Sequence, residues 1–285
     1  MDDSVTRRAI HVMDGKGAFE DVGLIVEEPL EIRVNGMPRA VVMRTPGYEM
    51  ELAAGFCLTE GIVDSYAEII GLDFCSNVSE NAGNVVNVVV DPEYALDIAG
   101  GGCGPAGDTL RRDVSRTLPS RSSCGICGVR MLEDLDRRLM PLDAGPEVGM
   151  ELLVSLQHRM LDHQRLFKTT RGGTHAVAHA RMSGELIVVR EDVGRHNALD
   201  KVIGHAMMEG IDCRDTVVLL SSRISFEMVQ KAVRARIPVV AAVSAATTLA
   251  VELAGRMGCT LAGRLRERSM TVYTHPERIR GINLA

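Results

Sequence analysis

The second half of the chain alternates short apolar runs with segments whose apolar residues recur at helical spacing. This alternation restricts the possible folds, because strands joined by helices of this length pair in one layered sheet. We therefore predict a largely parallel sheet covered by helices on both faces. The first two strands flank a Ser183-Gly184 turn and form a hairpin. The predicted strands are 174–181, 185–190, 216–220, 238–243, 260–262 and 271–273, and the predicted helices are 196–208, 226–235 and 247–257.

The first half is richer in strand signals. An Asn35-Gly36 pair lies between apolar runs, which is a strong hairpin signal. The pattern changes near residue 145, and 143–148 is the best linker candidate. We expect a smaller, strand-rich α+β domain over 1–145 and an α/β domain over 146–285. The predicted elements of the first half are strands at 24–27, 30–34, 40–43 and 85–90 and a helix at 48–59 that ends before Gly61.

The turns after the predicted strands carry hydroxyl and guanidinium groups. Open α/β sheets bind ligands at the carboxyl ends of their strands, and helix N-termini favour anions. Ser225 is a plausible N-cap for the helix that begins at Phe226. Near the C-terminus, alternating arginines form a cationic strip, unless they are simply the solvent face of an edge strand. An anionic ligand such as a nucleotide is expected at Arg195, His196, Ser222, Arg223, Ser225, Ser244, Arg264, Arg266 and Arg268.

Two cysteines, Cys124 and Cys127, lie in the loop 121–128, and each is followed by a glycine. Apolar residues at helical spacing follow from Val129 to Leu139, so both thiols would lie at or just before a helix N-terminus, which favours a thiolate. The spacing alone is compatible with half of a zinc site, a redox dithiol or another reactive thiol. The other five cysteines form no second pair at ligand spacing, which weakens the zinc interpretation.

Two histidines, His175 and His179, fall on the predicted strand 174–181. Residues four apart on a strand are separated by about 13 Å and cannot share one ion. We expect a structural or pocket-lining role for these histidines and no permanently bound metal. Cys57, Cys213 and Cys259 are expected to be buried as small hydrophobic residues.

Composition narrows the functional classes. An odd count of seven cysteines and the lack of a signal-peptide pattern indicate a reduced, cytoplasmic protein. The longest uncharged stretch, 237–251, falls short of the roughly 20 apolar residues that a membrane span needs. A formal net charge of −6 and the absence of tryptophan argue against a nucleic-acid partner.

Six sequence blocks stand in an order typical of one protein family. They are Thr45-Pro46-Gly47 with 53–61, Ser122-Ser123-Cys124-Gly125-Ile126-Cys127-Gly128, Gly172-Gly173-Thr174-His175-Ala176, 190–199, Ser225-Phe226-Glu227, and Val243-Ser244-Ala245 through Glu252. Together they resemble the formate dehydrogenase accessory sulfurtransferases (FdhD) from about residue 20 to 280. A Cys-x-x-Cys pair alone is common, so the resemblance depends on the ordered set.

The resemblance implies a specific activity. Family members take sulfur from a cysteine desulfurase as a protein persulfide and pass it to the molybdenum bis-guanine-dinucleotide cofactor, which formate dehydrogenase requires. By motif, Cys124 would carry the persulfide and Cys127 would be its neighbour. The sequence departs from the family pattern at Arg264 and Ser269. The family's cofactor-binding segment aligns with Arg264, Leu265, Arg266, Glu267, Arg268 and Ser269.

The resemblance also implies a cytidine-deaminase-like, three-layer α/β/α fold for the larger domain, and a possible homodimer. Two other functions compete with sulfur transfer. One is a non-catalytic chaperone that binds and delivers the cofactor, and the other is a zinc-stabilised or thiol-redox module.

Overall fold

The computed structural model describes residues 3–75, 83–91 and 139–282 of the 285-residue chain. The cysteine loop 121–128, with Cys124 and Cys127, lies outside the described residues, as does most of the helix predicted after Val129. In the part of the chain that the structure describes, no helix is both long and apolar enough to cross a bilayer.

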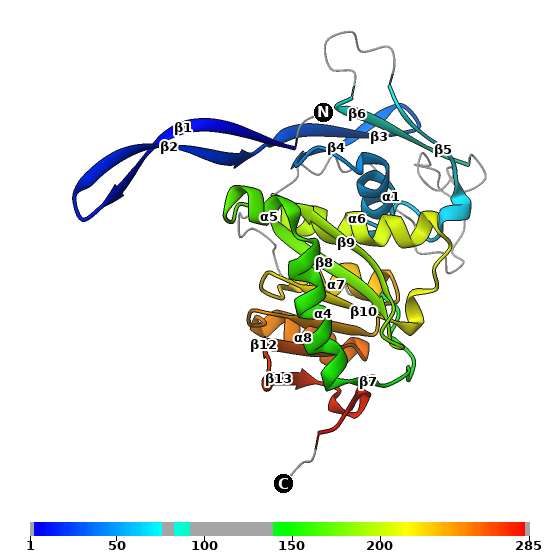
Figure 1. Cartoon of the computed structure of the whole chain (residues 1–285). Helices are drawn as coiled ribbons and strands as arrows, with labels where there is room; N and C mark the ends of the chain where they lie inside the picture. The colour runs from blue at the N-terminus through cyan, green and yellow to red at the C-terminus, as the bar shows by residue number, and fades with distance from the viewer. Residues whose placement is uncertain (1–2, 76–82, 92–138, 283–285) are drawn as a thin grey trace.

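A six-stranded sheet forms the centre of the larger part of the molecule (Figure 1). Its strand order is β13-β12-β11-β10-β8-β9. The hairpin of β8 and β9 confirms the predicted Ser183-Gly184 turn. The strands are β8 (His175–Arg181), β9 (Leu186–Asp192), β10 (Thr216–Leu220), β11 (Val239–Ala242), β12 (Thr260–Arg266) and β13 (Ser269–Thr274).

The sheet is mixed, so the prediction of a largely parallel sheet is wrong. Only β10, β11 and β12 run parallel to one another, because helices α7 (Phe226–Arg234) and α8 (Thr248–Met257) carry the chain back between them. Short turns join β8 to β9 and β12 to β13, and a short turn forces antiparallel pairing. Strand β8 also pairs antiparallel with β10.

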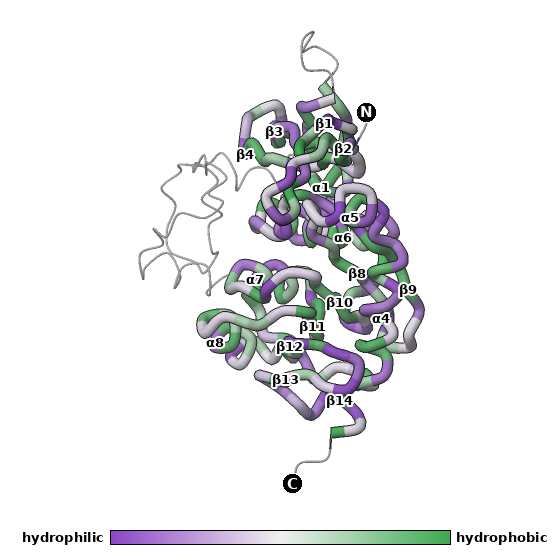
Figure 2. The backbone as a smooth tube through the Cα atoms, turned by 60° about the vertical axis from the view of Figure 1, so that its left-hand side comes forward, coloured by the Kyte–Doolittle hydropathy of each residue, from purple (hydrophilic) through white to green (hydrophobic). Residues whose placement is uncertain are grey.

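Helices cover both faces of this sheet, as predicted. Helix α6 (Arg195–Met208) and helices α7 and α8 cover one face, where they pack on the buried side chains of Val177 and Val218. Helix α4 (Met150–His163) covers the other, where Leu153, Leu156 and Met160 pack on the β8 alanines. Figure 2 shows α7 and α8 on one side of the central strands and α4 on the other. The short helix α5 (Arg165–Thr170) follows α4.

The N-terminal region forms a second, four-stranded sheet in the order β4-β3-β6-β5, with helix α1 (Glu49–Thr59) after β4. The Asn35-Gly36 turn is confirmed, and both residues have positive φ. The strand predicted at 24–27 is wrong, because one strand ends at Ile25 and the next begins at Glu28. The strands of this sheet are β3 (Glu28–Val34), β4 (Met37–Arg44), β5 (Ile69–Phe74) and β6 (Val85–Val90).

Strands β1 (Ser4–Met13) and β2 (Lys16–Ile25) form a long hairpin that projects away from the rest of the chain (Figure 1). The hairpin contacts α5 and the residue after it, Arg171, which pairs with Glu20 of β2 at 2.6 Å. The short strands β7 (Val148–Gly149) and β14 (Ile279–Arg280) pair near the C-terminus. Three short 3-10 helices complete the described elements, η1 (Tyr66–Glu68), η2 (Cys213–Asp215) and η3 (Pro276–Arg278).

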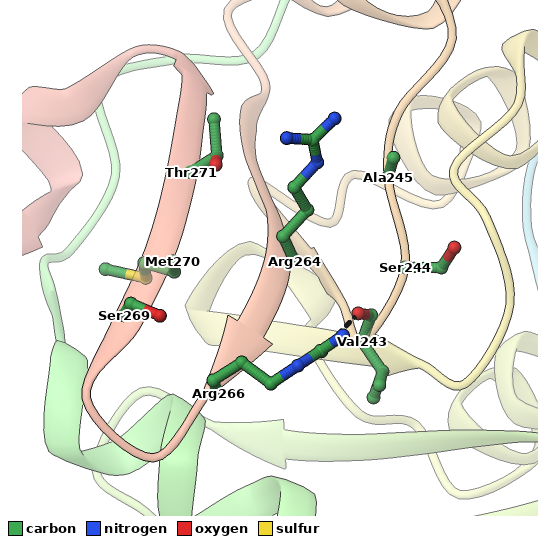
Figure 3. Close-up of a pocket in the computed structure, with 8 residues that line it drawn as sticks. All are labelled: Val243, Ser244, Ala245, Arg264, Arg266, Ser269, Met270 and Thr271. Atoms are coloured by element: carbon green, nitrogen blue, oxygen red, sulfur yellow. Dashed lines mark hydrogen bonds between the residues drawn. The ribbon is translucent and has the colours of Figure 1, made fainter.

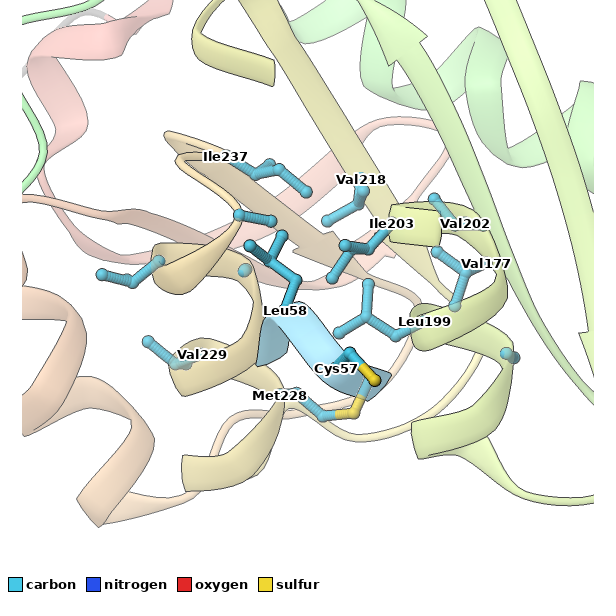
Figure 4. Close-up of a cluster of buried hydrophobic side chains, with 14 of the residues drawn as sticks. Cys57, Leu58, Val177, Leu199, Val202, Ile203, Val218, Met228, Val229 and Ile237 are labelled. Carbon is cyan, nitrogen blue, oxygen red and sulfur yellow. The ribbon is translucent and has the colours of Figure 1, made fainter. Parts of the chain in front are cut away.

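Helix α1 of the N-terminal region crosses α6 at two glycines. A Cβ at Gly55 would lie 1.9 Å from the Asp200 carbonyl oxygen, and one at Gly204 would lie 1.8 Å from that of Glu51. Backbone therefore contacts backbone, and no larger residue fits at either position. Cys57 and Leu58 of α1 pack among Leu199 and Ile203 of α6 and their neighbours (Figure 4). We call this α1–α6 contact the seam.

Two buried ion pairs extend the seam through adjacent residues of α6. Asp200 pairs with Lys231 of α7 at 2.9 Å and accepts a hydrogen bond from the Thr59 hydroxyl at 2.9 Å. Lys201 pairs with Asp192 at 2.7 Å and donates to the Thr45 carbonyl oxygen at 3.0 Å. Each pair thus ties the α/β body to the N-terminal region, and one core cluster contains residues of both halves. The domain boundary near 145 stays a prediction.

Candidate functional site

The carboxyl ends of the parallel strands β10, β11 and β12 meet at one edge of the sheet, which we call the carboxyl edge. The loops after β10 and β11 are joined by a bridge between Ile224 and Ala246. The Ile224 amide donates to the Ala245 carbonyl oxygen at 3.1 Å, and the Thr247 amide donates to that of Ile224 at 3.0 Å. These bonds fix the two loops next to each other.

A pocket of about 480 Å³ opens at this edge between the β11 loop and the β12–β13 hairpin (Figure 3). The Arg264 amide donates to the Ser244 carbonyl oxygen at 2.8 Å, and the Arg266 guanidinium donates to that of Val243 at 2.9 Å. A Cβ at Gly263 would lie 2.8 Å from the Ser244 oxygen, so glycine permits this approach. We call this the arginine pocket; its lining residues are Val243, Ser244, Ala245, Arg264, Arg266, Ser269, Met270 and Thr271.

Four of the predicted binding residues therefore come together in the arginine pocket: Ser244, Arg264, Arg266 and Ser269. The register between β12 and β13 is irregular from Gly263 to Arg266, and Arg264 has a positive φ of 54°. This irregularity determines how the two arginine side chains are directed. Leu265 is fully buried in the core, so its side chain does not line the pocket. Glu267 and Arg268 lie in the exposed turn between the two strands. Met270 and Thr271 also line the pocket. No binding role was predicted for either residue, although a strand was predicted at 271–273.

A second group of predicted residues gathers where α6 and α7 begin. His175 is the first residue of β8, and Arg195 and His196 open α6. His196 pairs with Glu227 in the first turn of α7, with 2.6 Å between Nε2 and Oε2. Burial, followed by the positive charges of Arg195 and His196, lowers the pKa of His175. We call His175, Arg195, His196 and Glu227 the imidazole cluster. Glu227 belongs to the family block Ser225-Phe226-Glu227, and no site role was predicted for it.

The loop after β10 holds Ser222, Arg223 and Ser225. The Ser222 hydroxyl donates to the Arg223 carbonyl oxygen at 3.0 Å. Ser225 occupies the N-cap position of α7, as predicted, but its side chain forms no capping hydrogen bond. Its buried hydroxyl oxygen has no partner among the described residues. By contrast, the Thr247 hydroxyl accepts a hydrogen bond from the Ala250 amide and caps α8.

The arginines at the carboxyl edge lack the carboxylate partners that many of the described arginines have elsewhere. In the N-terminal region and the seam, Arg44, Arg190 and Arg234 all pair with carboxylates. Within 3–75, 83–91 and 139–282, the guanidinium groups of Arg195, Arg223, Arg264 and Arg268 form no hydrogen bond or ion pair. Uncompensated guanidinium groups beside a pocket attract anions and bind phosphate oxygens well. The edge is therefore suited to an anionic ligand.

His179 and three of the described cysteines are poor candidates for reaction or metal binding. His175 and His179 lie on one strand, as predicted. His179 is fully buried with no hydrogen bond to a described residue, and burial lowers its pKa to about 3. Burial raises the pKa of Cys57, Cys213 and Cys259 to about 12, so these thiols stay protonated. Cys57 and Cys259 are buried, whereas Cys213 is partly exposed.

No three His, Cys, Asp or Glu side chains among the described residues are grouped so that they could hold one metal ion. Cys124 and Cys127 lie outside those residues, so the zinc alternative for this pair stays open.

Comparisons with known proteins agree over nearly the whole chain. A model of the FdhD/NarQ family matches residues 25–280. The sulfur carrier protein FdhD of Mycolicibacterium paratuberculosis is 44% identical over 276 residues, covering 96% of this chain and 97% of that protein. The same protein of Streptomyces avermitilis is 44% identical over 281 residues, covering 96% and 94%.

A solved structure from Desulfotalea psychrophila, described as a formate dehydrogenase accessory protein, shares the fold. Its TM-score is 0.75 at 24% identity, and the match covers 97% of this chain and 99% of that one.

Proposed function

The chain belongs to the FdhD/NarQ family, and on that premise we propose that it is a sulfurtransferase. It takes sulfur from a cysteine desulfurase as a persulfide on Cys124 and passes it to the molybdenum bis-guanine-dinucleotide cofactor, which is its substrate. The sulfurated cofactor then serves formate dehydrogenase. The names of the relatives support two parts of this proposal. "Sulfur carrier protein" supports the transfer of sulfur, and "formate dehydrogenase accessory protein" supports formate dehydrogenase as the enzyme that is served.

The first step of the proposed reaction is thiol–persulfide exchange. The Cys124 thiolate attacks the outer sulfur of the desulfurase persulfide, a new S–S bond forms, and the desulfurase cysteine leaves as a thiolate. No electron is gained or lost overall. The protonated thiols of Cys57, Cys213 and Cys259 are unsuited to this attack. Cys127 is proposed to act beside Cys124.

The unpartnered arginines of the carboxyl edge carry the substrate proposal. A guanine dinucleotide is anionic, and the arginine pocket offers about 480 Å³ beside two guanidinium groups. Ser244, Arg264, Arg266 and Ser269 would bind phosphate and ribose oxygens there. The neighbouring Arg268, Arg195 and Arg223 add positive charge that neutralises the ligand.

Several finer features belong to the same proposal. The six-stranded sheet with its two helix layers is proposed to be a cytidine-deaminase-like unit, and 1–145 and 146–285 to be separate domains. The protein is proposed to act in the cytoplasm, as a homodimer, without a resident metal and without nucleic-acid or membrane partners.

Intact-mass analysis after incubation with a cysteine desulfurase and cysteine tests the sulfur step. The expected product carries one added sulfur atom that reduction removes. The adduct should be absent from Cys124→Ala and present in the matched control Cys75→Ala, whose cysteine is partly exposed. An adduct that persists in Cys124→Ala would overturn the assignment.

Titration with guanosine diphosphate tests the pocket separately. Binding should weaken in Arg264→Gln. Nucleotide binding without any sulfur adduct would favour the cofactor-delivering chaperone, and stoichiometric zinc in the purified protein would favour the zinc or thiol-redox module.

A further inference from the structure

The imidazole cluster combines one guanidinium group and two imidazoles with a single carboxylate. His175, Arg195 and His196 come from β8 and α6, and the single carboxylate paired with them is that of Glu227. His196 is partly buried, with 24% of its side chain exposed, whereas 54% of the Glu227 side chain is exposed. The carboxylate therefore lies on the solvent side of the pair and can move away without disturbing the core.

The other charged groups that face the cluster are already neutralised. Asp192 of β9 is buried in its pair with Lys201 and also accepts hydrogen bonds from the Thr45 and Gly194 amides. Lys231 of α7 is buried in its pair with Asp200. If Glu227 moved away, the Arg195 guanidinium and the His196 imidazole would have no paired carboxylate among the described residues.

A buried oxygen at the start of α7 also lacks a partner among the described residues. The Ser225 hydroxyl lies two residues before Glu227 and forms no hydrogen bond with a described residue. A buried hydroxyl without a partner is costly, and a ligand oxygen would satisfy it. The guanidinium, the imidazoles and this hydroxyl are the groups that commonly bind phosphoryl oxygens.

We propose that the imidazole cluster is a second anion subsite, in which Glu227 takes the place of a phosphoryl group until the ligand displaces it. Two strand spacings, about 10 Å, separate β8 from β11, whose loop lines the near side of the arginine pocket, so a nucleotide-sized ligand can extend from this subsite to that side of the pocket. The identification of the phosphoryl group as part of a nucleotide rests on the proposed function. The exchange of Glu227 for an anion does not.

Calorimetric titration of the full chain with inorganic pyrophosphate tests the proposal. Glu227→Gln removes the competing charge and should bind pyrophosphate about 5-fold more tightly than the unmodified chain. Arg195→Gln should bind it about 10-fold more weakly. The chain offers a matched control in the His275–Glu277 pair, whose atoms are 3.0 Å apart beyond the far end of β13. Glu277→Gln should leave binding unchanged.

Equal or weaker binding of pyrophosphate by Glu227→Gln, in a variant whose melting temperature is unchanged, would overturn the subsite. So would an equal gain in Glu277→Gln, or no binding by either the unmodified chain or Glu227→Gln. The assay contains no sulfur donor, so failure of the persulfide on Cys124 leaves its result intact. Conversely, if Arg264→Gln loses guanosine diphosphate binding while Arg195→Gln binds it as tightly as the unmodified chain, the arginine pocket is retained and the subsite is excluded.

Discussion

The seam and the carboxyl edge differ in whether their charged side chains have partners of opposite charge. At the seam, every charge of the buried pairs has a partner, and Lys231 lies within 3.2 Å of Asp200 and Glu60 oxygens. At the carboxyl edge, four guanidinium groups have no partner among the described residues. Helix α6 serves both regions, since Arg195 and His196 open it at the edge and Asp200 and Lys201 lie further along it at the seam.

The difference follows from solvation. A buried charge without a partner costs several kcal/mol, so the seam is stable only when its pairs are complete. Arg223, Arg264 and Arg268 are exposed, and water compensates their charges until an anion replaces it. The free energy of unfolding is therefore expected to depend mainly on the seam. The affinity for an anionic ligand is expected to depend mainly on the carboxyl edge. Four changes test this separation.

The largest effect is expected from breaking a pair in the seam. Lys231→Met leaves Asp200 buried without its cation and should lower the free energy of unfolding by about 3–5 kcal/mol. Urea unfolding measures the change. The double variant Lys231→Met with Asp200→Asn should recover part of the loss, because it removes the uncompensated charge. A single variant as stable as the unmodified chain would contradict this account.

The next effect concerns the glycine crossing of α1 and α6. Gly204→Ala places a Cβ against the Glu51 carbonyl oxygen and should cost about 3 kcal/mol. Gly255→Ala in α8 is the matched control, since its Cβ would meet only Thr274 Cγ2 at 3.9 Å. That variant should gain about 0.5–1 kcal/mol from helix propensity. Similar losses in both variants would show that the close crossing is not the cause.

A smaller, pH-dependent effect is expected from His179, a buried imidazole that forms no hydrogen bond with a described residue. Its folded pKa of about 3 lies below the value of 6.5 for a free imidazole. The unfolded chain therefore binds the extra proton between these values, and stability falls as pH drops below about 6.5. The contribution between pH 7 and pH 5 is about 2 kcal/mol. His179→Leu should flatten the acid side of the unfolding profile, and an unchanged slope would contradict the assignment.

The smallest effect on stability is expected at the carboxyl edge. Arg223→Gln should change the free energy of unfolding by less than about 0.5 kcal/mol, because its guanidinium has no described partner to lose. It should weaken guanosine diphosphate binding about 5-fold, measured by calorimetry. Arg214→Gln, which removes an exposed pair with Asp212, serves as the control and should leave nucleotide binding unchanged. Destabilisation of Arg223→Gln without a loss of affinity would reverse the comparison.

Local signals predicted the second half of the fold well. The strand 216–220 was predicted to the residue, and α8 was predicted one residue early because Thr247 is its cap. The relative directions of the paired strands were predicted wrongly, because periodicity identifies helices and strands but does not show which strands become neighbours in the sheet. The strand order places β8 beside β10, and this depends on packing across the whole sheet.

The residues of the candidate site could be predicted only in part, because local patterns do not show which segments come together in space. Ser244, Arg264, Arg266 and Ser269 were expected from the turns and the family segment, and they line one pocket. Leu265 belongs to the same segment but points into the core, because alternate residues of a strand face opposite sides. Glu227 belongs to a family block, but its pairing with His196 depends on the approach of α7 to α6, which no local pattern predicts.

The crossing at Gly55 and Gly204 also constrains how the protein is made. Thr59 and Asp200, which are bonded at the seam, are 141 residues apart in the sequence. At about 5–20 residues per second, a ribosome needs roughly 7–30 s to synthesise that interval. Until α6 has emerged, Leu52, Ala53 and Leu58 of α1 lack the surface that buries them in the finished protein. The newly made N-terminal region is therefore expected to need chaperone protection during synthesis, and its completion must wait for the second half of the chain.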